Sequence, residues 1–272
     1  MKIAAHAIGF VFTCLFAISA HAGAWTQKTG TTQIINTTTF YTASRYFDVQ
    51  GKSRKQLPYH KQEVSTYAEY GLYEDVTLGG QFSFIRAYQE NATAPNSTAN
   101  LGDSEIFVRK RVWKGDLSVV SLQPGVVLPS PDSSRSIPKI GADRPSVGLR
   151  ASYGRAFKTF GQWDYAELSG GYLHRIGKAN DQISLDATVG INLNERWQLM
   201  PQAFLTKSRH QVGGRRFTES SADDYDLLKA QFSVQYTWQG VGAFQLGAFS
   251  HLYGKNTGEG KGLLARYIRT FP

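Results

Sequence analysis

A strict alternation of apolar and polar residues over positions 183–193 is the strongest constraint on what this chain can fold into. The odd positions hold Ile, Leu, Ala, Val, Ile and Leu, and the even positions hold Ser, Asp, Thr, Gly and Asn. A period of two residues is that of a β-strand, whose successive side chains point to opposite faces. A helix would spread these residues around its circumference. The stretch therefore predicts a strand with one apolar face and one polar face.

The same alternation recurs along the whole chain. Residues 228–238 show it next most clearly, with Leu, Ala, Phe, Val, Tyr and Trp on one face and Lys, Gln, Ser, Gln and Thr on the other. The expected strands are residues 32–47, 60–72, 76–89, 102–113, 117–129, 145–158, 162–176, 182–193, 196–209, 224–238, 241–253 and 260–271. Their lengths suit tilted membrane strands of about ten residues with extensions.

The links between the expected strands alternate between short and long. Short links fall near residues 73–75, 114–116, 159–161, 194–195 and 239–240. The other links are residues 48–59, 90–101, 130–144 and 210–223, with shorter ones at 177–181 and 254–259. Tight turns on one side and long loops on the other are typical of outer-membrane barrels. The pattern predicts an all-β fold, a single transmembrane antiparallel β-barrel of about 12 strands with both termini on the periplasmic side.

The chain begins with the three parts of a secretory signal peptide. A short basic start at Met1-Lys2 precedes an apolar run over residues 8–18 and the small residues Ala20 and Ala22. The apolar run is too short to span about 30 Å of hydrocarbon as a helix. We therefore expect residues 1–22 to be a signal peptide that is cleaved near Ala22, and residues 23–272 to be the exported barrel.

Composition agrees with export but does not select the fold. The single cysteine is Cys14, inside the expected signal, so the exported chain has no disulfide. No apolar run after the signal approaches 18 residues, which excludes helical membrane spans. A soluble β-rich periplasmic protein is compatible with this composition, and the alternating links favour the barrel over it. Because the chain leaves the cell interior, we expect no nucleic-acid partner.

Aromatic residues gather where the expected barrel meets the membrane surface. Trp113, Trp163, Trp197 and Trp238 all lie beside short links, as in the aromatic belt of a membrane interface. The final segment ends on Phe271, which predicts recognition by the barrel-insertion machinery through the C-terminal strand. Pro272 cannot donate a ladder hydrogen bond, so pairing should end at Phe271.

Two segments resemble known outer-membrane barrels. The segment Glu69-Tyr-Gly-Leu-Tyr-Glu-Asp-Val-Thr-Leu-Gly-Gly80 is similar to a hairpin common in small barrels of this kind. The stretch Gly102-Asp-Ser-Glu-Ile-Phe-Val-Arg-Lys-Arg111, followed by a strand ending Leu128-Pro-Ser-Pro131, resembles the meta-pathway phenol-degradation outer-membrane family of transporter-like barrels. That family has a Leu-Pro-Thr-Gly ending, from which this chain departs. The resemblance implies a transporter-like barrel and does not identify a substrate.

No arrangement typical of an enzyme is present in the sequence. A phospholipase barrel would carry a histidine beside a Ser-Asn-Gly run, and that motif is absent, as is Gly-x-Ser-x-Gly. The histidines are not spaced as metal ligands, and Asp223-Asp224-x-Asp226 lacks the glycine and distal glutamate of a calcium loop. We expect no catalytic residue, no metal and no cofactor.

The polar face of the strands supplies the candidate pore. Closing about twelve strands leaves an interior that water can fill. The charged residues on the polar parity are Glu105, Arg109, Arg111, Arg150, Glu167, Arg175, Asp186, Lys229 and Arg266. Six basic against three acidic side chains would attract anions. This predicts a passive channel or transporter for small, unidentified solutes with a net-basic lumen and a mild anion preference.

Two alternatives remain at this point. In the first, arginine and glutamate side chains pair across strands and plug the lumen, which leaves a structural or surface-interaction barrel. In the second, the chain is a lipid-modifying barrel enzyme.

Basic residues near the longer links predict contacts with outer-membrane lipid and the phosphates of lipopolysaccharide. These residues are Lys52, Arg54, Lys55, Arg135, Lys139, Arg144, Lys207, Arg209, Arg215 and Arg216.

Overall fold

A computed structural model describes residues 23–90, 95–131, 137–142, 144–177, 179–209 and 224–272. The expected signal peptide, the link at 210–223 and the basic residues Arg135, Arg215 and Arg216 lie outside the described residues. The strands are β1 Thr32–Phe47, β2 Ser53–Tyr73, β3 Val76–Gln89, β4 Asn96–Leu101, β5 Ser104–Lys114, β6 Ser118–Leu128, β7 Ser146–Thr159, β8 Gln162–Arg175, β9 Gln182–Asn192, β10 Trp197–Ser208, β11 Asp226–Trp238, β12 Gly242–Lys255 and β13 Thr257–Phe271. Within the described part of the chain, no helix is long and apolar enough to cross a membrane.

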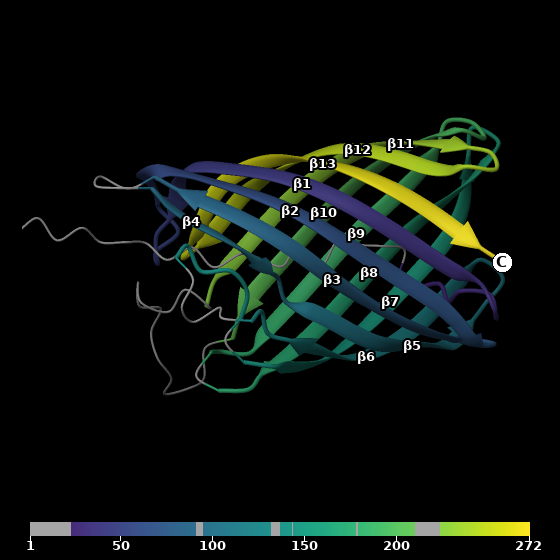
Figure 1. The fold of residues 1–272 in the computed structure, drawn as a ribbon. Helices are drawn as coiled ribbons and strands as arrows, with labels where there is room; N and C mark the ends of the chain where they lie inside the picture. Colours follow the sequence, from purple (N-terminus) through teal and green to yellow (C-terminus); the bar gives the residue numbers. More distant parts are fainter. Residues whose placement is uncertain (1–22, 91–94, 132–136, 143, 178, 210–223) are drawn as a thin grey trace, which may run out of the picture.

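The strands form one closed antiparallel barrel (Figure 1). Strands that are neighbours in sequence pair with each other, apart from β4 and β5, and β1 also pairs with β13, which closes the cylinder. Strand β3 pairs with β5 along its first half and with β4 along its second half. The strands β4 and β5 thus follow one another in a single wall position, and the barrel has 12 strands with β4 as an extra one. All-antiparallel pairing is confirmed.

Alternating burial confirms the two faces of the strands. In β9, Ile183 and Leu185 are 48% and 45% exposed, whereas Asp186 and Thr188 are 6% and 3% exposed. The apolar side chains therefore point outward and the polar ones inward, which is the reverse of a water-soluble sandwich. A bilayer explains this inversion, because a closed sheet satisfies its backbone groups internally and can present mainly apolar side chains to lipid.

The two ends of the barrel differ as the link lengths predict. Short turns occupy the end at which β13 stops (Figure 1), and Phe160 and Gly161 form one of them with φ of 51° and 78°. Two consecutive positive φ values are those of a tight hairpin turn whose twist matches the strands. Phe271 pairs with Thr32, and the pairing ends there as expected. The four tryptophans beside these turns are exposed on the outside, where an interfacial belt would lie.

Three expected links are shorter in the structure. The link at 90–101 contains β4, whose alternation was too weak in polar residues such as Asn96, Ser97 and Thr98 to show in the sequence. The link at 254–259 reduces to Asn256, because β12 runs to Lys255 and β13 begins at Thr257. Asn256 has a φ of 53°, a left-handed conformation that asparagine tolerates. The expected loop at 48–59 likewise shrinks because β2 begins at Ser53.

Candidate functional site

The lumen of the barrel is the candidate site, and its wall is polar along most of its length. Small and amide side chains supply most of this lining, and they come from every part of the wall. Buried members of this set are Thr37, Thr77, Ser83, Ser121, Gln123, Ser152, Ser169, Thr188, Gln202, Gln231, Ser233 and Gln245. Neighbouring strands are bridged through such groups, for example by Gln231 Nε2 donating to Gln202 Oε1 at 2.6 Å.

Five of the nine charged residues predicted for the lumen line one internal cavity of about 140 Å³. They are Glu105, Arg150, Arg175, Asp186 and Lys229. The Arg150 guanidinium forms an ion pair with Asp186, although β8 separates their strands. Arg175 Nη1 lies 3.7 Å from Asp224 Oδ1. The sequence left open that charged side chains of the lumen pair with one another. Arg150 and Arg175 do have such carboxylate partners.

Two cations of the set lack a carboxylate partner among the residues that the structure describes. The Lys229 ammonium lies 4.1 Å from the ring centroid of Phe204 and 5.4 Å from that of Phe249. Aromatic faces attract cations through their quadrupole, so these rings hold the ammonium without neutralising it. Arg266 Nη1 donates a long hydrogen bond of 3.4 Å to Gln245 Oε1, while its Nε and Nη2 have no hydrogen-bond partner.

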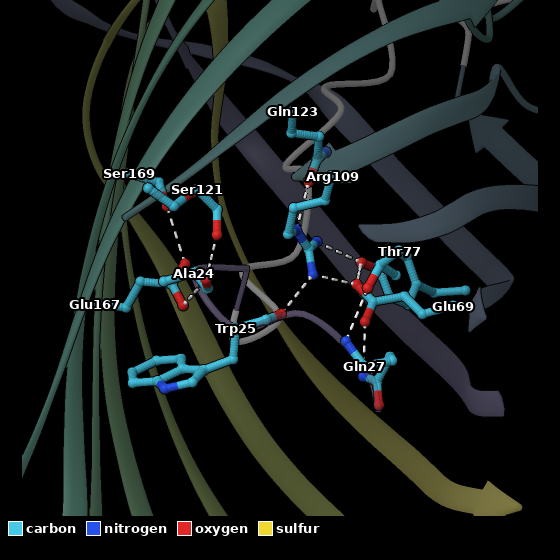
Figure 2. Close-up of polar contacts among 12 residues, drawn as sticks. Ala24, Trp25, Gln27, Glu69, Thr77, Arg109, Ser121, Gln123, Glu167 and Ser169 are labelled. Carbon is cyan, nitrogen blue, oxygen red and sulfur yellow. Dashed lines mark hydrogen bonds and ion pairs between the residues drawn. The ribbon is translucent and has the colours of Figure 1, made fainter. Parts of the chain in front are cut away.

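Arg109 is the centre of a second group at the short-turn end of the lumen (Figure 2). It is 2% exposed, and its Nη1 lies 2.6 Å from Glu69 Oε1. Arg109 also donates to Gln123 Oε1 at 3.0 Å, to the Tyr67 hydroxyl at 3.1 Å and to the backbone carbonyl of Trp25 at 3.1 Å. A guanidinium presents five N–H donors in a planar fork, which suits several simultaneous acceptors. Here it joins two strands of the wall to a segment that is not part of the wall.

That segment is the stretch before β1, which lies inside the barrel. The backbone N–H of Ala24 donates to Glu167 Oε2 at 3.2 Å, and the Ala24 carbonyl accepts from Ser121 Oγ at 2.5 Å. Ala24 is fully buried as a result. Glu167 also accepts from Ser169 Oγ at 2.9 Å. Side chains of β6 and β8 thus bind Ala24 from two directions (Figure 2).

Gln27 continues the same contact toward β2 and β3. Its backbone N–H donates to Thr77 Oγ1 at 2.8 Å, and its side-chain amide donates to Glu69 Oε2 at 2.7 Å. The Trp25 ring packs edge-on against Tyr165 with 5.7 Å between ring centroids. Residues 24–28 therefore fill the short-turn end of the lumen, and we call them the N-terminal plug.

A glycine in the wall makes room for the N-terminal plug. A Cβ at Gly154 would lie 2.5 Å from the Trp25 ring and 2.7 Å from the Ala24 Cβ. Both distances are far below van der Waals contact, so any larger residue at this position would collide with the plug.

The opposite end of the lumen is closed by the link between β6 and β7. Its residue Ile140 is fully buried and packs in an apolar cluster with Tyr41, Tyr59, Ile85 and Ala87 from the inner faces of β1, β2 and β3. The described part of this link, residues 129–131, 137–142 and 144–145, we call the inward loop. An isoleucine held in this cluster keeps the inward loop inside the mouth.

Asp103 fastens the inward loop to the wall. Its carboxylate accepts from the backbone N–H of Ser130 at 2.7 Å and from that of Ala142 at 2.9 Å. Gly141, with a φ of 76°, lies so close that a Cβ would approach Asp103 Oδ1 to 2.3 Å. Gly102 is equally confined, because a Cβ there would meet Ser83 Oγ at 2.3 Å. The Gly-Asp pair of the motif quoted above is thus an anchor for a loop.

The fold has counterparts among solved structures. It is similar to an outer membrane channel from Pseudomonas putida F1, with a TM-score of 0.73 and 14% sequence identity over 93% of this chain and 99% of that chain. The translocator domain of the autotransporter NalP from Neisseria meningitidis matches with a TM-score of 0.50 and 12% identity over 90% of each chain. No family model matches the chain, and no curated protein matches it in sequence.

The chain is a bacterial outer-membrane β-barrel. At these identities the similarity extends to the fold and not to the chemistry of the lumen. The predicted fold class and location in the outer membrane of a Gram-negative bacterium are confirmed. From the usual arrangement of outer-membrane barrels, we expect the long-loop end, with β4, to face the cell exterior and the N-terminal plug to lie at the periplasmic end.

The nine predicted residues of the barrel fall into four places. Glu105, Arg150, Arg175, Asp186 and Lys229 share the central cavity, Arg109 and Glu167 hold the N-terminal plug, and Arg111 pairs with Asp75 at the β2–β3 turn. Arg266 of β13 contacts Gln245 of β12, on the same side of the barrel as Lys229 of β11. Whether they line an open pore stays a prediction.

Sequence reasoning missed several carboxylates that face the lumen. The buried acidic side chains of the described residues are Asp48, Glu69, Asp103, Asp164, Glu167, Asp186, Asp224 and Asp226. The buried lysines and arginines are Arg109, Lys139, Arg175, Lys229 and Arg266. Parity could have found both Glu69, which shares a face with Tyr67, and Asp103, which shares a face with Glu105 within the expected strand 102–113. Uncompensated positive charge is therefore confined to the part of the wall that carries Lys229 and Arg266.

Proposed function

We propose that this barrel is a passive channel for small solutes across the outer membrane, with a mild anion preference that arises at Lys229 and Arg266. The observation that carries the proposal is the inversion of the two faces, with polar and charged side chains lining a central cavity and apolar ones covering the outside. A structural barrel would gain nothing from an interior that holds unpaired cations, because burying such charges costs free energy.

The fold supports the same activity. The Pseudomonas putida F1 protein that this chain resembles is an outer membrane channel. We extend that activity to this chain as part of the proposal, because both chains are covered almost completely by the match. No solute follows from the similarity.

The anion preference follows from the distribution of charge. Arg150 and Arg175 have carboxylate partners, so their fields are largely cancelled nearby. Lys229 and Arg266 have none among the described residues, and they stand on the β11 and β13 side of the wall. An uncompensated cation in a narrow, low-dielectric passage concentrates anions beside it.

A plugged barrel is the second candidate, and a specific observation favours it. The N-terminal plug occupies the periplasmic end and the inward loop occupies the extracellular end. Gly141 and Ala142 of the inward loop line the central cavity of about 140 Å³. The channel hypothesis therefore requires at least one of the two closures to yield.

Reconstitution into a planar bilayer tests the proposal. The wild-type barrel should conduct and should pass chloride more readily than potassium, and the Lys229→Gln/Arg266→Gln variant should lose that preference. The matched control is Lys158→Gln, which removes an exposed cation from the outer wall. Absence of conductance in both the wild type and a variant lacking residues 23–28 would support the plugged barrel, and cation selectivity of the wild type would exclude the anion preference.

A further inference from the structure

A row of polar and basic side chains crosses the outer wall of the barrel where lipid should lie. The register pairs Thr42 of β1 with both Lys261 of β13 and His60 of β2, and pairs His60 with Tyr88 of β3. Arg86 lies two residues before Tyr88 on the same face of β3. The side chains of His60, Arg86 and Lys261 are exposed. Strands lie about 4.8 Å apart, so the three strand steps from β13 to β3 span about 14 Å, a distance that one large ligand can cover.

The outer-face residues on the periplasmic side of this row are mainly apolar, although Gln62 of β2 and, further from the row, Asn36 of β1 are exposed and polar. Phe40, Val64, Phe84 and Leu263 are 52%, 46%, 50% and 62% exposed on the same outer face. Each lies closer to the periplasmic end than the row residue of its own strand. Phe40 is two residues from Thr42 and Val64 is four residues from His60. Phe84 is two residues from Arg86 and Leu263 is two residues from Lys261. A lipid whose acyl chains cover these side chains would place its headgroup at the row.

Apolar exposure also continues beside the row. Ser250 of β12 pairs with Lys261, and Leu252, two residues nearer the extracellular end, is 58% exposed. On β12 the lipid-facing surface thus extends beyond the height of Lys261. The row is therefore embedded at the edge of the apolar belt and does not belong to the solvated loops.

The row differs from its charged neighbours in having no carboxylate. One step nearer the extracellular end, Arg45 lies 3.2 Å from Glu259, and on the inner face Lys61 lies 2.9 Å from Glu63. Among the described residues no acidic side chain lies within 4.0 Å of His60, Arg86 or Lys261. Unpaired basic groups at the edge of hydrocarbon are unfavourable unless an anion from the membrane meets them.

We propose that this row binds the phosphate of a phosphorylated glycolipid in the outer leaflet. Arg86 and Lys261 supply charge-assisted hydrogen bonds to the phosphate oxygens, and the His60 imidazole and the Tyr88 hydroxyl complete the donors. Phe40 and Leu263 receive the acyl chains, and all of these residues line one groove. The ligand belongs to the membrane, so the site is independent of what crosses the lumen.

Lipid binding to the purified barrel tests the assignment. Native mass spectrometry would count bound lipid A that carries both phosphates, with enzymatically dephosphorylated lipid A as the comparison. The test variant is His60→Gln/Arg86→Gln/Lys261→Gln, and the matched control is Lys158→Gln/Arg269→Gln, which removes exposed cations near the periplasmic turns. Heat-modifiable gel mobility verifies that each variant is folded.

We expect the wild type and the control to bind diphosphorylated lipid A at least about tenfold more tightly than the test variant, because two charge-assisted contacts are lost. Conductance should be the same in all three, so this test is separate from that of the proposed channel. Equal binding of dephosphorylated lipid A by the wild type, or undiminished binding by the test variant, would overturn the proposal. Full competition by inorganic phosphate would also overturn it, since the site would then recognise a free anion.

Discussion

The two ends of the lumen are closed by different interactions, mainly polar at one end and partly apolar at the other. At the periplasmic end, the N-terminal plug is held by hydrogen bonds to Arg109, Ser121, Thr77 and two glutamates. At the extracellular end, the inward loop is held by hydrogen bonds to Asp103 and, in addition, by the burial of Ile140 in an apolar cluster. Hydrogen bonds can be exchanged for bonds to water when the plug leaves, whereas exposing the apolar cluster has no such compensation.

This difference indicates which closure yields first. The N-terminal plug touches the wall mainly through polar groups and is connected to it at one end by β1. The inward loop is connected at both ends and is clamped by Asp103 near both. We therefore expect solute passage to require displacement of the plug, with the inward loop acting as a fixed constriction.

Removing the centre of the polar closure should have the largest effect. In the Arg109→Met variant, Glu69 loses its ion-pair partner while both it and Tyr67 stay buried. Breaking a buried pair by removing one partner costs about 3–5 kcal/mol. The free energy of unfolding, measured by urea titration of the barrel in lipid vesicles, should fall by that amount, and conductance should rise as the plug loosens.

Arg111→Met is the matched control, since Arg111 pairs with Asp75 at the β2–β3 turn and Asp75 is more exposed than Glu69. That variant should lose less than about 1 kcal/mol. Equal losses in the two variants would show that the Arg109 network is not the closure that matters.

Loosening the extracellular closure should have the next largest effect. Asp103→Ala removes the acceptor of the Ser130 and Ala142 N–H groups, and hydrogen bonds to a charged group contribute about 1.5–3 kcal/mol. In intact vesicles, we expect protease to cleave the inward loop of this variant faster than that of the wild type. Ile140 should still anchor the loop, so conductance should rise less than in the Arg109→Met variant; a larger rise would reverse the order of the two closures.

Displacing the plug without touching its polar partners should have a smaller energetic effect. The Cβ of Gly154→Ala would collide with Trp25 and Ala24, so the plug must shift while the wall stays intact. We expect a measurable increase in single-channel conductance with a change in unfolding free energy below about 1 kcal/mol. Gly170→Ala is the control, because its nearest neighbour would be the Ser184 carbonyl oxygen at 4.0 Å. Identical conductance of both variants would show that the plug does not limit passage.

The wall of the barrel could be predicted from the sequence to a degree that the lumen could not. Expected strands 32–47 and 76–89 match β1 and β3 at both ends, because lipid and water impose a period of two on their residues. The plug and the inward loop have no such period. Their positions depend on single contacts such as those of Asp103 and on glycines that leave space, such as Gly154. These contacts join residues far apart in sequence, so no local pattern marks them.

The smallest expected effect concerns the extracellular rim, where a carboxylate caps the β1–β2 turn. Asp48 accepts from the backbone N–H groups of Gln50 at 2.9 Å and Lys52 at 2.8 Å, and its Oδ2 lies 2.9 Å from Arg54 Nε. Burial acts to raise the pKa of Asp48, but the hydrogen bonds from Lys52, Arg54 and Gln50 outweigh it and hold the pKa below its usual 3.8. A lowered pKa means that the turn is stabilised above the unfolded value and loses this contribution only as the pH falls through the folded value. Amide chemical shifts of Gln50 and Lys52 in nanodiscs should therefore stay constant down to pH 3.8 and change below it. In Asp48→Asn, which cannot titrate, that change should vanish, and a transition well above pH 3.8 in the wild type would show that the cap is not formed.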